Sequence, residues 1–101
     1  LLVSPALAGD ERYTQKDCTD EASAVGIRSA REEIVISNMS ESDVVYIGKA
    51  DVTATTGFPV LPGTALSVNS MCGSGPCASL AKFCITEDGL TVRIGIKENL
   101  R

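Results

Sequence analysis

The sequence predicts an all-β fold: a small antiparallel β-sandwich or jelly-roll-like domain with an extended N-terminal arm. Apolar residues make up 44% of the 101 residues, and they are mostly Val, Ile, Leu and Ala, with no Trp and only two Phe and two Tyr. A core rich in β-branched residues favours strands over helices. Short apolar runs also recur about every ten residues with turn residues between them, as is typical of sandwiches. A chain of this length is one domain with one modest core.

The first 22 residues differ from the rest of the chain and are predicted to lie outside the sandwich, which then comprises residues 23–101. Residues 1–9, LLVSPALAG, carry no charge and form the arm, whose apolar side chains are expected to pack on a neighbouring subunit: Leu1, Leu2, Val3 and Leu7. An alternative is the tail of a secretory signal, because Ala6-Leu7-Ala8 matches the small-x-small pattern of a signal-peptidase site. Residues 10–22 are polar and highly charged, and they read as an extended linker with a short edge strand near residues 12–16.

The pattern of apolar residues predicts strands at Arg31–Asn38 and at residues 43–49. Ile34 and Ile36 share one face of the first strand, which indicates a half-buried position. The second strand has apolar residues on both faces, which predicts a central or covered position. A polar turn of four to five residues separates the two runs, so the sequence predicts that they form an antiparallel hairpin.

The second half of the chain supplies three more strands. Leu61-Pro62-Gly63 suits a type II turn, after which residues 64–69 alternate with Leu66 and Val68 inward. Residues 80–86 and 90–98 are the next two strands, and Asp88-Gly89 between them is a strong hairpin signal. The last strand has the clearest alternation, with these residues on one face: Leu90, Val92, Ile94 and Ile96.

The chain has only four aromatic residues, and two of them, Phe58 and Tyr46, are candidates for the core or for an interface. Phe58 stands between Gly57 and Pro59 on an irregular segment and is expected in the core. Tyr46 lies in the strand 43–49, where it is either a core residue or a contact residue for a partner. Tyr46 therefore joins the arm residues as an interface candidate.

Four cysteines permit two disulfides with three possible connectivities. We favour Cys72–Cys77, which closes a six-residue loop, and Cys18–Cys84, which closes a much longer one. The chain-entropy model assigns them roughly 2 and about 4 kcal/mol, respectively. Cys84 could instead be a buried free thiol within an apolar strand. The spacing of the cysteines does not match a zinc ribbon.

Composition excludes several classes of function. The net charge is −4 and the nine basic residues are scattered, so nucleic acid is not expected as a partner. The chain has no His, which removes the commonest general base and any Ser-His-Asp site. We predict no catalytic, cofactor-binding or metal-binding residues and no cofactor. No apolar run approaches the roughly 20 residues of a membrane span.

The order of features in residues 31–98 resembles a known group of proteins. An R-x-x-I-x-I-x-N strand is followed by a short turn, D-V-V-Y-I-G, a Val/Thr-rich loop, G-F-P-V-L-P-G, a strand, and a closing pair of strands. This pattern is similar to that of small β-sandwich structural proteins of tailed-phage virions. Those proteins decorate capsids or form the bases of head and tail fibres. The resemblance covers about two thirds of the chain, and the arm, the linker and the cysteines are not part of it.

The resemblance implies a non-enzymatic structural protein of a virion. Its expected partners are other copies of itself, in a homo-oligomer, and capsid or fibre proteins. The signal-like start and the cysteines favour an alternative, a secreted extracellular filament subunit or adhesin-like domain of a prokaryote, stabilised by disulfides.

Overall fold

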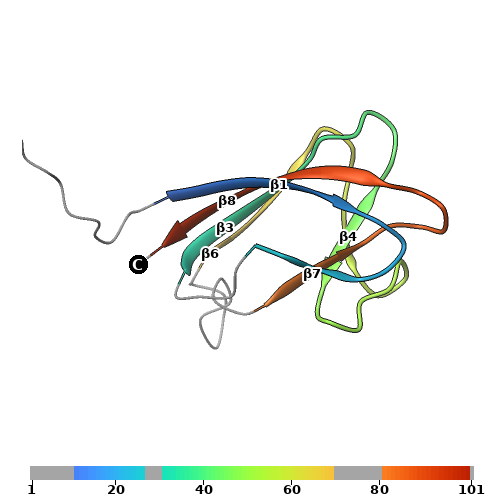
Figure 1. Cartoon of the computed structure of the whole chain (residues 1–101), viewed down its shortest axis with the longest axis horizontal. Helices are drawn as coiled ribbons and strands as arrows, with labels where there is room; N and C mark the ends of the chain where they lie inside the picture. The colour runs from blue at the N-terminus through green and yellow to red at the C-terminus, as the bar shows by residue number, and fades with distance from the viewer. Residues whose placement is uncertain (1–10, 27–30, 70–80, 101) are drawn as a thin grey trace, which may run out of the picture.

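The computed structural model describes residues 11–26, 31–69 and 81–100, and in these ranges the chain forms eight β-strands and no helix (Figure 1). The all-β prediction is confirmed. The strands are β1 (Glu11–Cys18), β2 (Ser23–Val25), β3 (Arg31–Asn38), β4 (Val45–Gly48), β5 (Phe58–Val60), β6 (Ala65–Asn69), β7 (Lys82–Ile85) and β8 (Val92–Leu100).

The strands form two antiparallel sheets of four strands each, in the orders β1-β8-β3-β6 and β2-β7-β4-β5. Figure 1 shows the two layers, with β1 running beside β8. The partners are nested: β1 pairs with β8, β2 with β7, β3 with β6 and β4 with β5. The chain thus behaves as one long hairpin wrapped across two sheets, which is the topology of a jelly roll.

The core lies between the sheets and consists almost entirely of β-branched side chains. Alternation along each strand sends every second residue inward, and the buried cluster is Cys18, Val25, Ile34, Ile36, Val45, Ile47, Val60, Cys84, Val92, Ile94 and Ile96. The inward faces predicted for Arg31–Asn38 and for Val92, Ile94 and Ile96 are therefore confirmed. No aromatic side chain belongs to this cluster of described residues.

The two hairpins predicted from local turn signals are wrong. β3 and β4 lie in different sheets, as do β7 and β8, so each turn carries the chain across the sandwich. The turn chemistry is nevertheless present, since Gly89 has a φ of 80°. The predicted central position of residues 43–49 is confirmed, because β4 lies between β7 and β5.

Asn38 organises the crossing from β3 to β4. Its buried side-chain amide donates hydrogen bonds to the carbonyl oxygens of Asp43 and Val60, both at 2.8 Å. Its side-chain oxygen accepts a hydrogen bond from the backbone N–H of Ser40 at 2.8 Å. One side chain therefore ties the crossing loop to β5 of the opposite sheet.

Residues 11–22 differ from the linker that was expected to precede the domain. Glu11–Cys18 is a full strand of the sandwich, and it pairs with β8 from Glu11↔Asn99 to Cys18↔Val92. The reason is that pairing with β1 satisfies the backbone hydrogen-bonding groups on one side of the long strand β8. The polar side chains of β1 suit its position at the edge of the sheet. The predicted short strand at residues 12–16 lies within it.

Candidate functional site

One side of the sandwich, formed by the edge strands β1 and β2, is closed by polar and covalent links. Lys16 Nζ on β1 donates hydrogen bonds to Ser23 Oγ at 2.8 Å and to the carbonyl oxygen of Ala24 at 2.6 Å on β2. Partial burial lowers the pKa of this ammonium group. The ammonium group carries three N–H donors, and two of the bonds that it donates join β1 to β2.

A disulfide joins Cys18 at the end of β1 to Cys84 in β7, with the two Cα atoms 5.9 Å apart. It is one of the two pairings favoured from the sequence, and it connects the two sheets. Both cysteines are fully buried. The other pair, Cys72 and Cys77, lies outside the described residues.

A buried carboxylate lies at the far end of β8. Glu98 is completely inaccessible to solvent, and its Oε1 accepts a hydrogen bond and ion pair from Arg12 Nε at 3.1 Å. Gly26 packs against the same group: a Cβ at that position would lie 2.6 Å from Glu98 Oε2. The sequence contained a signal for this burial, because Glu98 continues the inward alternation of Val92, Ile94 and Ile96.

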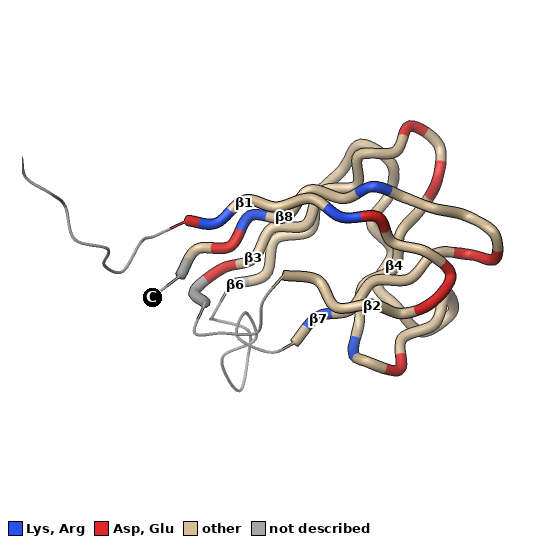
Figure 2. Tube along the Cα trace, in the orientation of Figure 1, with Lys and Arg blue, Asp and Glu red and all other residues tan. Residues whose placement is uncertain are grey.

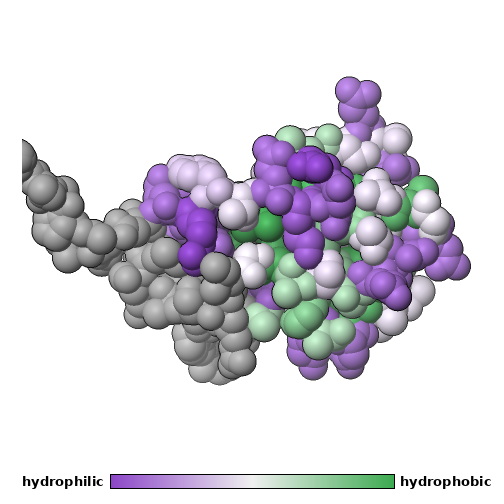
Figure 3. Space-filling view, in the orientation of Figure 1, coloured by the Kyte–Doolittle hydropathy of each residue, from purple (hydrophilic) through white to green (hydrophobic). Residues whose placement is uncertain are grey.

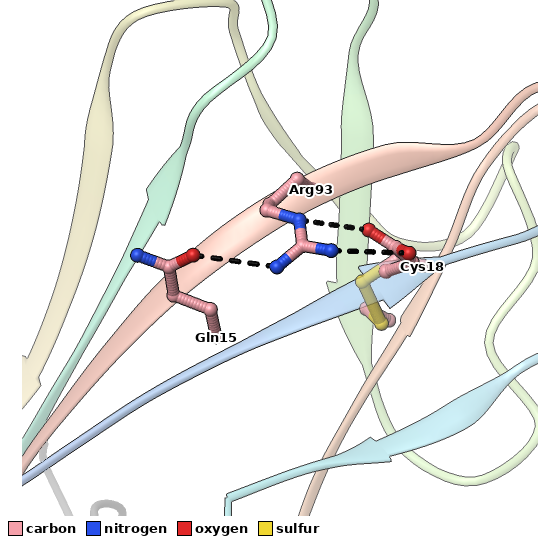
Figure 4. A network of polar contacts seen from close by, with 5 residues as sticks. Gln15, Cys18 and Arg93 are labelled. Carbon is pink, nitrogen blue, oxygen red and sulfur yellow. Dashed lines mark hydrogen bonds and ion pairs between the residues drawn. A yellow bond between two sulfur atoms is a disulfide. The ribbon is translucent and has the colours of Figure 1, made fainter.

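The outer face of the first sheet is polar and paired across its strands. Arg93 on β8 donates to the carboxylate of Asp17 and, through Nη1, to Gln15 Oε1 at 3.3 Å (Figure 4). The Arg93–Asp17 pair is about half exposed, so it contributes little to stability. It does connect β8 to β1 on the outer face of the sheet.

A shallow depression of about 530 Å³ lies on this face and is lined by residues of β1, β3 and β8, with Gly95 and Ser37 among them. Tyr13, which is 66% exposed, is at its side. Tyr13 Oη donates a 2.6 Å hydrogen bond to Glu11 Oε1, which lowers the pKa of Glu11 and raises the pKa of Tyr13. The ammonium of Lys97, 3.6 Å from Glu11 Oε2, lowers the Glu11 pKa further.

The loops between strands concentrate acidic residues. Figure 2 shows Asp and Glu in the loops at the right-hand end of the molecule, and a depression of about 540 Å³ there is lined by Asp20, Glu87 and Asp88, among others. Tyr46, the interface candidate on β4, is half-buried and donates a hydrogen bond to Glu87 Oε2 at 3.2 Å. Like charges at this end disfavour a second copy of the chain packing there.

On the side of the sandwich opposite β1 and β2, the described residues leave apolar side chains exposed. A groove of about 350 Å³ lies between β6 of one sheet and β4, β5 and β7 of the other. Its apolar lining is contributed by Ile47, Phe58, Leu66, Val68 and Ala81, and Lys49 and Lys82 also line it. We call this surface the apolar groove. Figure 3 shows that, on the visible face, hydrophobic surface is exposed between hydrophilic side chains near β4 and β7.

Phe58 corrects a sequence-based expectation, because it is 59% exposed and not part of the core. It has the same parity on β5 as the buried Val60, so it faces the interior side of its sheet. The sheets do not close over it, and its ring lines the apolar groove instead. Its position between Gly57 and Pro59 marked an irregular edge but gave no signal for this exposure.

The remaining predicted site residues are placed as follows. The arm residues Leu1, Leu2, Val3 and Leu7 lie outside the described residues. Within residues 11–26, 31–69 and 81–100, no three His, Cys, Asp or Glu side chains are grouped in a way that could hold a metal ion. In the same ranges no helix is both long and apolar enough to cross a membrane.

Comparisons with models of protein families, with curated proteins and with solved structures found no match for this chain.

Proposed function

We propose that this chain is a non-enzymatic structural protein of a phage virion, which decorates or cements the capsid or forms a fibre base. The observation that carries the proposal is the combination of jelly-roll topology with the virion-like order of features in residues 31–98. The jelly roll recurs in viral capsid proteins and also in lectins and cupins. The fold alone does not decide between them, so the sequence pattern supplies the preference.

The surfaces of the molecule support a packing role. The polar face of the first sheet has its charges paired, the loops carry like charges, and the apolar groove leaves Phe58 and half-buried Leu66 and Val68 without a full cover from the described residues. Burying an apolar side chain of this size in an interface is worth about 1.5–3 kcal/mol. Many copies in one particle multiply such a contact through avidity. In this proposal the chain works as a homo-oligomer.

A second candidate function is favoured by one specific observation, the Cys18–Cys84 disulfide. Disulfides persist in oxidising surroundings, which include the exterior of cells. A secreted filament subunit or adhesin-like domain would meet that condition. The disulfide does not argue against the first proposal, because virions also persist outside cells.

Antibody labelling of native particles in negative-stain electron microscopy separates the two candidates. Label on icosahedral heads or on tails supports the virion protein and shows which part of the particle to study. Label along thin extracellular filaments would replace it with the secreted subunit. A matched control is the same antibody after absorption with the purified chain, which must remove the label in either case.

A further inference from the structure

The two lateral sides of the sandwich differ, and this difference indicates a docking site. Between β1 and β2, Lys16 and the Cys18–Cys84 disulfide link the sheets directly. Between β6 and β5, the described residues show an apolar groove in which Phe58 is largely exposed. A second chain seated in this groove would remove these apolar side chains from water, which is favourable.

The lining restricts what the groove can bind. Its walls are aliphatic and aromatic, and Lys49 and Lys82 are the charged residues that line it. It therefore suits an uncharged apolar segment that is followed by acidic residues, and it disfavours a basic segment. Among the described residues, β6 pairs only with β3, so its outer edge also offers backbone groups to an extended chain.

The chain itself contains a segment with these properties. Residues 1–9 have no charged side chain and include Leu1, Leu2, Val3 and Leu7, and Asp10 and Glu11 follow directly. Fully extended, nine residues span roughly 30 Å, which is ample for a groove of this size. Pro5 prevents continuous strand pairing, so side chains in the groove must provide the main contact.

The topology places the arm and the groove at opposite edges of one sheet. The arm precedes β1, whereas the groove lies at β6, three strands away in the order β1-β8-β3-β6. Three strand spacings amount to about 14 Å. Copies arranged side by side therefore bring the β1 edge of one to the β6 edge of the next, in a head-to-tail contact that repeats.

We propose that the apolar groove of one copy receives the arm, residues 1–9, of a neighbouring copy. This inference rests on the proposed structural role and identifies the partner surface for it. Leu2, Val3 and Leu7 supply the apolar contact with Phe58, Leu66 and Val68. Asp10 then lies near Lys49 at the mouth of the groove.

Photo-crosslinking of the full chain tests where the arm binds. Phe58 is replaced by p-benzoylphenylalanine, and the protein is irradiated as an equal mixture of ¹⁴N and ¹⁵N chains before mass spectrometry. We expect crosslinks from position 58 to residues 1–9, half of them between chains of different isotope. A matched control carries the same photoreactive residue at Leu61, which is 55% exposed but does not line the groove.

Every other pattern contradicts the proposal. Crosslinks to the arm of the same chain only would show that the groove is filled in cis. Crosslinks to residues 70–80, or none above the Leu61 control, would show that the arm does not bind there. These failures leave the virion proposal intact, because antibody labelling of particles is read independently of the groove.

Self-association measured by analytical ultracentrifugation gives a second, independent test. Leu7→Asp introduces a charge where the arm should enter the groove, and it should raise the dissociation constant by about tenfold or more. Ser4→Asp adds the same charge without removing an apolar side chain and should have a smaller effect. Equal effects of the two substitutions would argue that charge alone controls association, and no effect of either would overturn the proposal. Circular dichroism of both variants verifies that the fold is unchanged.

Discussion

Arg12 Nε lies 3.1 Å from Oε1 of Glu98, so a partly exposed cation on β1 contacts a fully buried carboxylate on β8. The two residues are direct partners in the antiparallel register. A buried charge is tolerated only when it is paired and hydrogen-bonded. The stability of this end of the sandwich should therefore depend on Arg12 more than its surface position suggests.

Replacing Arg12 tests this dependence. Arg12→Met keeps most of the aliphatic stem but removes the Arg12 guanidinium group from the buried Glu98 carboxylate, and we expect a loss of about 3 kcal/mol in the free energy of unfolding. Urea denaturation measures it. Lys97→Gln is the control, because the Lys97–Glu11 pair is exposed and its loss should cost less than about 1 kcal/mol. Equal losses in the two variants would show that burial of Glu98 has no energetic consequence.

Gly26 is the second residue on which the stability of the sandwich around Glu98 should depend. Its φ is +70°, and a Cβ would lie 2.6 Å from Glu98 Oε2, so Gly26→Ala should cost about 3 kcal/mol through both strain and steric conflict. Gly63→Ala is a matched control, because Gly63 has φ +74° but no atom within 4 Å of the added Cβ. It should lose only the strain term, about 1 kcal/mol. Thermal and urea unfolding measure the loss of stability in both variants. Equal losses would show that Glu98 moves aside without cost.

Removal of the inter-sheet disulfide should destabilise the protein strongly. The crosslink closes a loop with a sequence separation of 66 residues, and the chain-entropy model assigns about 4 kcal/mol to it. The double variant Cys18→Ala/Cys84→Ala should lose that amount in urea denaturation under oxidising conditions. Cys72→Ser/Cys77→Ser serves as the comparison, and a larger loss in that variant would contradict the assignment.

The side chain of Asn38 should be needed for the crossing between sheets. Asn38→Ala leaves two carbonyl oxygens and one N–H without their partner, and we expect a loss of about 3 kcal/mol. Ser40→Ala, which removes hydrogen bonds within the same turn, should cost about 1 kcal/mol. Chemical denaturation ranks the two, and the reverse order would show that the turn, not the contact with β5, holds the crossing.

The pKa of Glu11 depends on its contacts with Tyr13 and Lys97 on the outer face of the first sheet. Because the pKa is lowered in the folded state, Glu11 favours folding above its unfolded-state pKa, and this small contribution is lost as pH falls through the folded-state value. Tyr13→Phe removes the main cause and should raise the Glu11 pKa more than Lys97→Gln does. A carboxyl-detected NMR titration measures both. Tyr46→Phe should leave the Glu11 pKa unchanged, and an equal rise in that variant would contradict the local origin.

The sequence predicted the fold class and the buried faces because both depend on local alternation. Ile34 and Ile36 face inward for the same reason that Val92, Ile94 and Ile96 do, namely the two-residue period of a strand. The same rule places Glu98 inward, although charged residues are seldom fully buried. The tertiary contact with Arg12 pairs that buried charge with a cation.

Strand pairing could not be predicted in the same way, since it depends on contacts between distant residues. Asp88-Gly89 is a strong hairpin signal, yet here the turn carries the chain from one sheet to the other. The polar residues 10–22 predict a linker with only a short edge strand near residues 12–16, whereas the full strand Glu11–Cys18 forms by pairing with β8, about 80 residues later in the chain. Phe58 was assigned to the core because aromatics are scarce, but the position of the β6 edge decides its exposure.

The Cys18–Cys84 bond also determines how the molecule responds to tension. β1 and β8 are antiparallel neighbours with Glu11 beside Asn99, so a force that separates the two ends would open their ladder one hydrogen bond at a time, as a zipper opens. Such opening stops at the covalent link between Cys18 and Cys84. The segments before Cys18 and after Cys84 can extend, while the loop between the two cysteines carries none of the load. A subunit of this design is compliant at its ends and inextensible in its body.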